Sequence, residues 1–110
     1  MGATNTLAFT KRQNAVAGIM KALAHPARVA IIDYLLKTES CICGDIVNEL
    51  PLSQPTVSQH LKELKNAGLI KGNIEGNAIC YCINESTFSE FQDFLTGIFI
   101  KIEKQKAKCC

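Results

Sequence analysis

The sequence predicts a single, mostly α-helical domain that spans residues 1–110 and carries one small β-hairpin. Apolar residues recur at helical spacing along most of the chain, and only two strand-like runs, 69–74 and 78–83, flank a short Gly/Asn turn. A length of 110 residues, 47% of them hydrophobic, leaves room for one core and not for a second domain. A capped helix directly precedes the hairpin. This is the layout of a winged helix-turn-helix, in the order α-α-α-α-β-β-α.

Three helices are expected upstream of that capped helix. The first covers about residues 5–23, the second begins at Pro26, and a short third runs from about Cys43 to Leu50. Their expected core-facing residues are Leu7, Val16, Ile19, Met20 and Leu23; then Val29, Ile32, Leu35 and Leu36; then Ile46, Val47 and Leu50. Together these stripes would form one core behind the fourth helix.

The fourth helix, from Ser53 to about Leu69, has the features of a DNA-reading element. Ser53 supplies an N-cap hydroxyl, and Pro55 lies in the first turn, where a missing N–H costs nothing. The apolar stripe that would anchor the helix consists of Val57, Leu61 and Leu64. Hydrogen-bonding side chains occupy its outer, N-terminal part: Gln54, Thr56, Ser58, Gln59 and His60. Such side chains can bond base edges in a major groove, although an ordinary amphipathic surface helix would show the same pattern.

The hairpin that follows would form the wing. Gly68 ends the fourth helix at its C′ position, and in the second strand Cys80 and Cys82 share one face. The net charge is only +2, so phosphate contacts would rely on hydroxyls, backbone amides and a few lysines. The residues expected on the DNA backbone are Lys62, Lys65, Lys71 and Asn77, and Ser53 completes the predicted DNA-binding set.

Both ends of the chain carry amphipathic stretches wider than so small a core requires. The apolar residues of the last stretch, about 86–106, are Phe88, Phe91, Phe94, Leu95, Ile98, Phe99 and Ile102. We expect residues 5–23 and 86–106 to form a homodimer interface, the alternative being a terminal helix folded back on its own domain. A two-fold dimer would place two DNA-reading helices roughly 34 Å apart, as palindromic half-sites require.

Six cysteines fall as three close pairs, Cys41/Cys43, Cys80/Cys82 and Cys109/Cys110. The sequence has neither a signal peptide nor an apolar stretch long enough to span a membrane, so we expect a cytoplasmic protein without a membrane partner. In a reducing cytoplasm these residues would be thiols rather than a disulfide framework. A C-x-C pair can direct two sulfurs at one soft ion.

Several segments resemble, in order, the ArsR-type (ArsR/SmtB) family of winged helix-turn-helix metalloregulatory repressors. They are ALAHPAR at 22–28, CICGDI at 41–46, LSQPTVSQHL at 52–61, AGLI at 67–70 and the turn and strand at 75–81. The resemblance covers roughly residues 15–84, and the LSQPTVSQHL segment with its wing is specific for the family. It implies a homodimeric repressor that binds double-stranded operator DNA and releases it when an inducer binds.

The resemblance also implies a sensing site. The family's arsenic and cadmium/lead sensors carry ELCVCDL at the third helix, and residues 39–46 are similar to it with Gly44 inserted, so Cys41 and Cys43 match two ligand positions. No cysteine follows one turn later, which leaves Cys109 or Cys110 to supply a third thiolate. The implied inducer is As(III) or Sb(III), with Cd(II) or Pb(II) as alternatives, and no cofactor is obligatory. A zinc site on the last helix is disfavoured because that helix has no histidine.

Other interpretations of the cysteines remain open. The same fold could carry an oxidation or persulfide switch, although a bond within C-x-C or Cys-Cys is geometrically hard to form. A thiol enzyme is disfavoured because no C-x-x-C lies beside a βαβ pattern and no cysteine has an evident histidine partner. Cys80 and Cys82 are interpreted as half-buried strand residues that sensing does not require.

Overall fold

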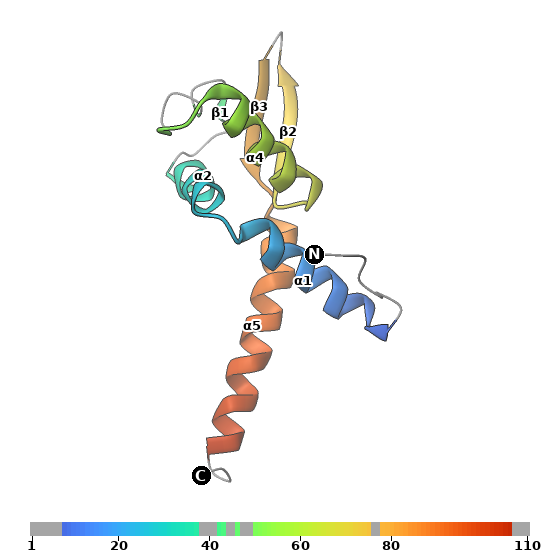
Figure 1. The fold of residues 1–110 in the computed structure, drawn as a ribbon. Helices are drawn as coiled ribbons and strands as arrows, with labels where there is room; N and C mark the ends of the chain where they lie inside the picture. Colours follow the sequence, from blue (N-terminus) through green and yellow to red (C-terminus); the bar gives the residue numbers. More distant parts are fainter. Residues whose placement is uncertain (1–7, 38–41, 44–45, 47–49, 76–77, 107–110) are drawn as a thin grey trace.

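The computed structural model describes residues 8–37, 42–43, 46, 50–75 and 78–106. The elements are α1 (Lys11–Leu23), α2 (Pro26–Leu36), β1 (Ile42–Cys43), α4 (Gln54–Asn66), β2 (Ile70–Glu75), β3 (Ala78–Ile83) and α5 (Glu85–Lys106). Helices α2 and α4 lie beside the sheet, α1 crosses the start of α5, and the rest of α5 extends away towards the C-terminus (Figure 1). The molecule is accordingly long, 56 × 34 × 24 Å. The predicted class, mostly helical with a β-hairpin before the last helix, is confirmed.

Helix α1 begins at a capping box. The Gln13 N–H donates to Thr10 Oγ1, and the Thr10 N–H donates to Gln13 Oε1, both at 3.0 Å. The cap explains why the described helix begins at Lys11, whereas the sequence suggested a start near residue 5. Residues 1–7, including the expected core residue Leu7, lie outside the described part of the chain.

Helix α2 begins at Pro26 and is capped by His25, whose Nδ1 accepts the Ala27 N–H at 3.0 Å. Its buried residues are Ile31, Ile32 and Leu35. The predicted stripe was wrong for Val29 and Leu36, which are 46% and 64% exposed. Most α2 residues are apolar, so periodicity alone could not identify the face that packs against α1, α4 and β3.

The sheet has three antiparallel strands in the order β1-β3-β2. The hairpin pairs Ile70 with Ile83 and Glu75 with Ala78, as the sequence suggested. β1 was not expected: the third helix was predicted to start at Cys43, but Ile42 and Cys43 form a strand that pairs with β3. A two-residue strand has no periodicity that a sequence could reveal. Farther along, Ile46 is helical and buried, as predicted, while Val47 lies outside the described residues.

The core lies between α1, α2, α4 and the sheet. Its most deeply buried side chains are Ile31, Ile46, Leu64, Leu69 and Val57. Burying a side chain of this size stabilises the fold by about 1.5–3 kcal/mol relative to leaving it exposed. Phe88 and Phe91, in the first half of α5, pack against this core. These contacts hold the N-terminal half of α5 against the domain.

In the described part of the chain, no single helix is long and apolar enough to cross a membrane, although α1 and α2, bent by 91° at the break between them, pass that test of length and composition as a pair.

Candidate nucleic-acid interface and thiol site

Helix α4 is held from both its buried face and its C-terminal end. Val57, Leu61 and Leu64 are buried, as the sequence predicted. At the end of the helix, the Gly68 N–H donates to Lys65 O and the Leu69 N–H donates to Leu64 O, which is a Schellman motif. Gly68 has φ +81°, a left-handed conformation that favours glycine. These contacts therefore hold α4 in place relative to the hairpin β2–β3.

Asn84 secures the turn between α4 and the wing. Its Nδ2 donates to Gly68 O at 2.8 Å, and its backbone N–H donates to Leu69 O at 3.0 Å. Because Asn84 directly precedes α5, this residue connects the end of α4, the end of β3 and the start of α5. Sequence analysis did not identify Asn84, since its partners lie 15 and 16 residues away.

The start of α4 presents polar side chains to solvent. Gln54, Thr56, Ser58 and Gln59 are all exposed, as a surface that reads base edges requires. Ser53 is the N-cap residue, but its hydroxyl makes no bond to the helix backbone. Instead, Ser53 Oγ lies 2.9 Å from Thr56 Oγ1. The predicted capping bond of Ser53 is therefore wrong, and both hydroxyls stay at the exposed surface.

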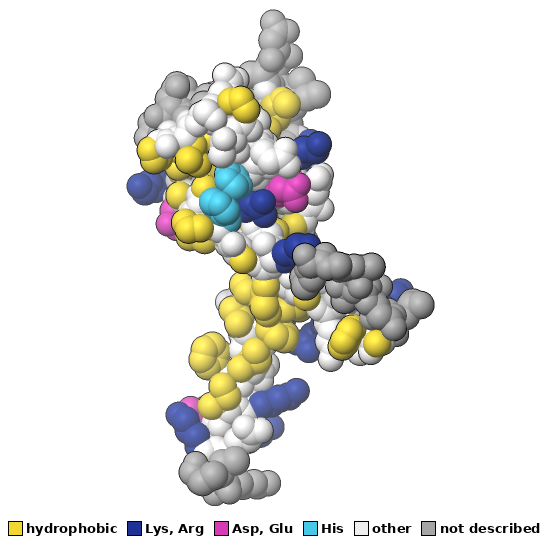
Figure 2. Space-filling view, viewed as in Figure 1, with side chains coloured by type: hydrophobic (Ala, Val, Ile, Leu, Met, Phe, Trp, Pro, Cys, Tyr) yellow, Lys and Arg dark blue, Asp and Glu magenta, His cyan; other side chains and the backbone are white. Residues whose placement is uncertain are grey.

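His60 differs from these residues because its side chain is only 9% exposed. Arg28 Nε donates to His60 Nδ1 at 3.1 Å, and the His25 ring lies against it with the centroids 4.4 Å apart. The two histidines are visible together in Figure 2. Burial, followed by the charges of His25 and Arg28, lowers the pKa of His60 below 6.5. His60 thus packs α4 against α2, and the expectation that it faces outward with its polar neighbours is corrected.

Lysines line the junction of α4 and the wing. Lys62, Lys65 and Lys71 are exposed. A Cβ on Gly72 would lie 3.2 Å from Lys65 Nζ, so the absence of a side chain at Gly72 lets the Lys65 ammonium rest against β2. Positive charge therefore continues from helix to hairpin, which is where a phosphate backbone would pass beside a helix inserted in a groove. Asn77 lies outside the described residues.

The second half of α5 presents apolar side chains to solvent. The exposed residues are Leu95 (37%), Ile98 (38%), Phe99 (66%), Ile100 (52%) and Ile102 (41%). They form part of the apolar surface along α5 in Figure 2. Phe94 is half-buried, with the Arg12 guanidinium 5.3 Å from its ring centroid. The helix thus divides: Phe88 and Phe91 fold back on their own domain, and the residues beyond Phe94 do not.

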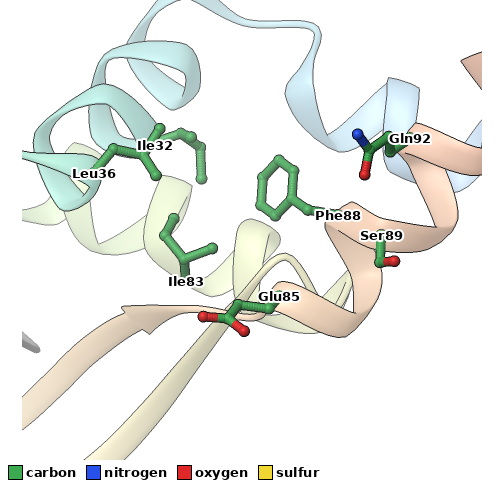
Figure 3. Close-up of a pocket in the computed structure, with 7 residues that line it drawn as sticks. All are labelled: Ile32, Leu36, Ile83, Glu85, Phe88, Ser89 and Gln92. Atoms are coloured by element: carbon green, nitrogen blue, oxygen red, sulfur yellow. The ribbon is translucent and has the colours of Figure 1, made fainter.

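A hollow of about 370 Å³ lies where α5 leaves the domain. Its apolar side is formed by α2, β3 and Phe88, and its polar side by the first turns of α5 (Figure 3). The lining residues are Ile32, Leu36, Ile83, Glu85, Phe88, Ser89 and Gln92. This hollow could not be expected from the sequence, because its walls come from three separate segments.

Two cysteines from different predicted pairs, Cys43 and Cys80, are neighbours across the sheet, which the sequence did not predict. Cys43 in β1 is directly opposite Cys80 in β3. Cys80 is fully buried, Cys82 is half-buried, and both are disulfide-bonded. The predicted ligands Cys41, Cys109 and Cys110 lie outside the described residues. Across the ranges that are described, no three His, Cys, Asp or Glu residues are grouped so as to hold a metal ion.

Residues 25–71 match the family described as bacterial regulatory protein, arsR family. The chain is 32% identical over 95 residues to the biofilm growth-associated repressor of Xylella fastidiosa, covering 86% of this chain and 82% of that protein. It is 36% identical over 77 residues to the arsenical resistance operon repressor of Staphylococcus xylosus, covering 70% and 69%. An ArsR-like transcriptional regulator from Rhodococcus sp. RHA1 has a similar fold, with a TM-score of 0.75, 20% identity and coverage of 89% and 92%.

Proposed function

The chain belongs to the ArsR family of bacterial regulatory proteins, and we propose that it acts as a homodimeric repressor that releases its operator when As(III) or Sb(III) binds. The two relatives described above are named repressors, which supports regulatory DNA binding rather than catalysis as the activity of this chain. A protein with this role works beside DNA, so the proposal places it in the cytoplasm.

The observation that carries the DNA-binding part of the proposal is the exposed face of α4. Gln54, Ser58 and Gln59 project from a helix whose opposite face is buried and whose C-terminal end is fixed. An amide can donate and accept at the same base, which suits bidentate contact with adenine, and a serine hydroxyl can contact several bases. Lys65 and Lys71 would then hold the phosphates beside the groove. We therefore assign operator reading to α4 and backbone contact to the wing.

Dimerisation is supported by the apolar side chains on the second half of α5. Contiguous apolar surface that a chain leaves exposed marks an interaction site in most soluble proteins. A second copy of the same helix would cover it symmetrically, and the resulting two-fold axis would relate two copies of α4. Two such helices match a palindromic operator.

The inducer assignment is supported by donor chemistry and position. The C-x-C pair Cys41/Cys43 offers two thiolates, which prefer soft ions to hard ones. Cys43 lies on β1, whose partner strand β3 is part of the wing, so a change at this pair can reach the DNA-binding surface directly. Cys109 or Cys110 would supply the third thiolate. For release, the ion must bind the DNA-free conformation more tightly than the operator-bound one.

An operator titration in the presence of arsenite, cadmium, zinc or peroxide tests this function. We expect arsenite to release the reduced wild-type protein, and Cys41→Ser and Cys43→Ser to bind operator but resist release. Replacing Cys109 and Cys110 by Ser should weaken the arsenite response without abolishing it. Normal arsenite release of the Cys41→Ser/Cys43→Ser protein would place the ion elsewhere and overturn the ligand assignment.

A redox-responsive repressor of the same fold is the second candidate, and one observation favours it. Cys80 and Cys82 are disulfide-bonded, whereas the arsenic proposal assigns them no role. Peroxide would then release the operator where arsenite does not, and the same titration separates the two candidates.

A further inference from the structure

Cys80 and Cys82 occupy alternate positions on β3, so they share one face of the sheet. Residues two apart on a strand are separated by about 6.4–6.8 Å, and their side chains project in parallel, which keeps the Cβ atoms equally far apart. A disulfide requires Cβ atoms about 3.5–4.5 Å apart. Both residues are held in regular strand by β2, with Cys80 opposite Asn73 and Cys82 opposite Lys71. Their disulfides are therefore made to other cysteines rather than to one another.

The strand on the other side of β3 brings a cysteine directly opposite. Cys43 and Cys80 are register partners in the antiparallel β1–β3 pair. Facing residues in such pairs have Cα atoms about 4.5–5.5 Å apart, and disulfides span Cα separations of about 4.4–6.8 Å. The backbone register alone thus satisfies the distance that a Cys43–Cys80 bond needs.

The spacing of the cysteines in the sequence predicts a second cross-strand pair, Cys41 and Cys82, in the same register. In an antiparallel ladder, two residues forward on one strand correspond to two residues back on the other. Cys82 is two residues after Cys80, and Cys41 is two residues before Cys43. Cys41 lies outside the described residues, so its part rests on spacing. Both C-x-C pairs have the same spacing, which lets one register align all four cysteines.

We propose that Cys43–Cys80 and Cys41–Cys82 are cross-strand disulfide pairs, a reversible oxidation site that joins β1 to wing strand β3. Most disulfides of proteins that work beside DNA in a reducing compartment are transient and regulatory. For each pair, two thiols and one hydrogen peroxide give one disulfide and two waters: the thiolate attacks the peroxide to form a sulfenic acid, which the second thiol converts to the disulfide. Peroxide is the two-electron oxidant, and a cellular thiol would reverse the reaction by exchange.

The two pairs differ in access. Cys80 is fully buried and Cys82 is half-buried, so peroxide reaches the Cys82 pair more readily. We expect the Cys41–Cys82 bond to form first and the Cys43–Cys80 bond to form more slowly.

One consequence rests on the proposed function. If Cys41 and Cys43 are the As(III) ligands, their sulfurs cannot bind the ion while they form disulfides, since only thiolates are ligands. The oxidised protein would then be insensitive to arsenite. Peroxide and arsenite would compete for the same two residues.

Disulfide mapping of the full-length chain tests the pairing without any DNA. Trypsin cleaves after Lys37, Lys62, Lys71, Lys101 and Lys108, among other sites, which separates the three cysteine pairs into three peptides. After peroxide treatment and alkylation without reductant, we expect peptides 38–62 and 72–101 to be joined, and dithiothreitol to separate them. An internal Cys80–Cys82 bond, or a link from either peptide to Cys109/Cys110, would overturn the proposal.

Single variants assign the partners. In Cys80→Ser, Cys43 should become open to alkylation while Cys41 stays protected, and in Cys82→Ser the two should exchange. The Cys109→Ser/Cys110→Ser protein is the matched control and should retain both bonds. Protection of Cys43 in Cys80→Ser would contradict the pairing. Arsenite binding by protein with both mapped bonds would instead overturn the Cys41/Cys43 ligand assignment and leave the pairing intact.

Discussion

Helices α4 and α5 are both amphipathic, but the faces that they leave exposed have opposite chemistry. α4 buries Val57, Leu61 and Leu64 and exposes amides, hydroxyls and lysines. The second half of α5 exposes large apolar side chains such as Ile98 and Phe99. A polar face suits a hydrogen-bonding partner such as DNA, whereas an apolar face requires a partner that removes it from water. The exposed face of α4 therefore suits DNA recognition, and the exposed face of α5 suits assembly with a second copy.

The largest effect is expected for Ile98→Asp on the exposed half of α5. An unpaired carboxylate inside an apolar helix interface is strongly unfavourable, so the variant should be monomeric at concentrations where the wild type is dimeric. Sedimentation equilibrium measures this directly. Lys104→Asp is the control, because it introduces the same carboxylate at an exposed α5 position that is already charged, and it should leave the dimer intact. A dimeric Ile98→Asp protein would remove α5 from the interface.

Phe91, seven residues earlier, should behave differently. Its half-buried ring packs on the core of its own domain, so Phe91→Ala should destabilise the fold rather than separate subunits. A fully buried Phe loses about 3–5 kcal/mol on truncation to Ala, and roughly half of that is expected here. Urea unfolding gives the loss. A variant that became monomeric with unchanged unfolding would show that Phe91 belongs to the interface instead.

On α4, Gln54→Ala and Ser58→Ala should each weaken operator binding by about 1–3 kcal/mol and leave stability unchanged. Both side chains are exposed, so their loss removes no packing. Ser89→Ala provides the control, since Ser89 is an exposed serine on α5, away from the proposed DNA surface. Wild-type affinity in both α4 variants would mean that this helix does not read the operator.

Local signals explain why much of this arrangement could be predicted from the sequence. The buried stripe of α4 and its Gly68 terminus depend on spacing and on a single left-handed residue, both visible in a short segment. The order of helices and hairpin follows from similar patterns. The fold class was therefore predicted correctly, and so was the exposure of Gln54, Thr56, Ser58 and Gln59.

Features that depend on distant partners were not predictable in the same way. His60 has the same polar character as Gln59, and only Arg28, 32 residues earlier, explains why one side chain is buried and the other exposed. Similarly, nothing local indicates that Cys43 faces Cys80, since β1 is defined only by its pairing. The apolar stripe of α5 reads as continuous, and tertiary packing alone divides it at Phe94.

A smaller effect is expected at the contact between α4 and α2. The pKa of His60 is lowered mainly by burial, so the folded state favours neutral imidazole and the unfolded state takes up a proton first as pH falls. Stability should therefore decrease as pH drops from about 7.5 through the unfolded value near 6.5, and level off below the folded pKa. His60→Gln should show a shallower decrease between about pH 7.5 and 5.5 in urea unfolding. An equally steep decrease would assign the dependence to other groups.

The smallest effect is expected for the lysines beside α4. Lys71 is exposed on β2, where a phosphate contact would contribute charge without base recognition. Each phosphate contact adds roughly 0.9 to the slope of log affinity against log salt concentration, so Lys71→Ala in a dimer with two wings should reduce the slope by about 1.8. The loss should be the same for specific and non-specific DNA, measured by titration across salt concentrations. Lys104→Ala, near the far end of α5, is the control and should leave the slope unchanged. A slope that is unaltered by Lys71→Ala would separate the wing from the phosphate backbone, and leave α4 as the element that holds the DNA.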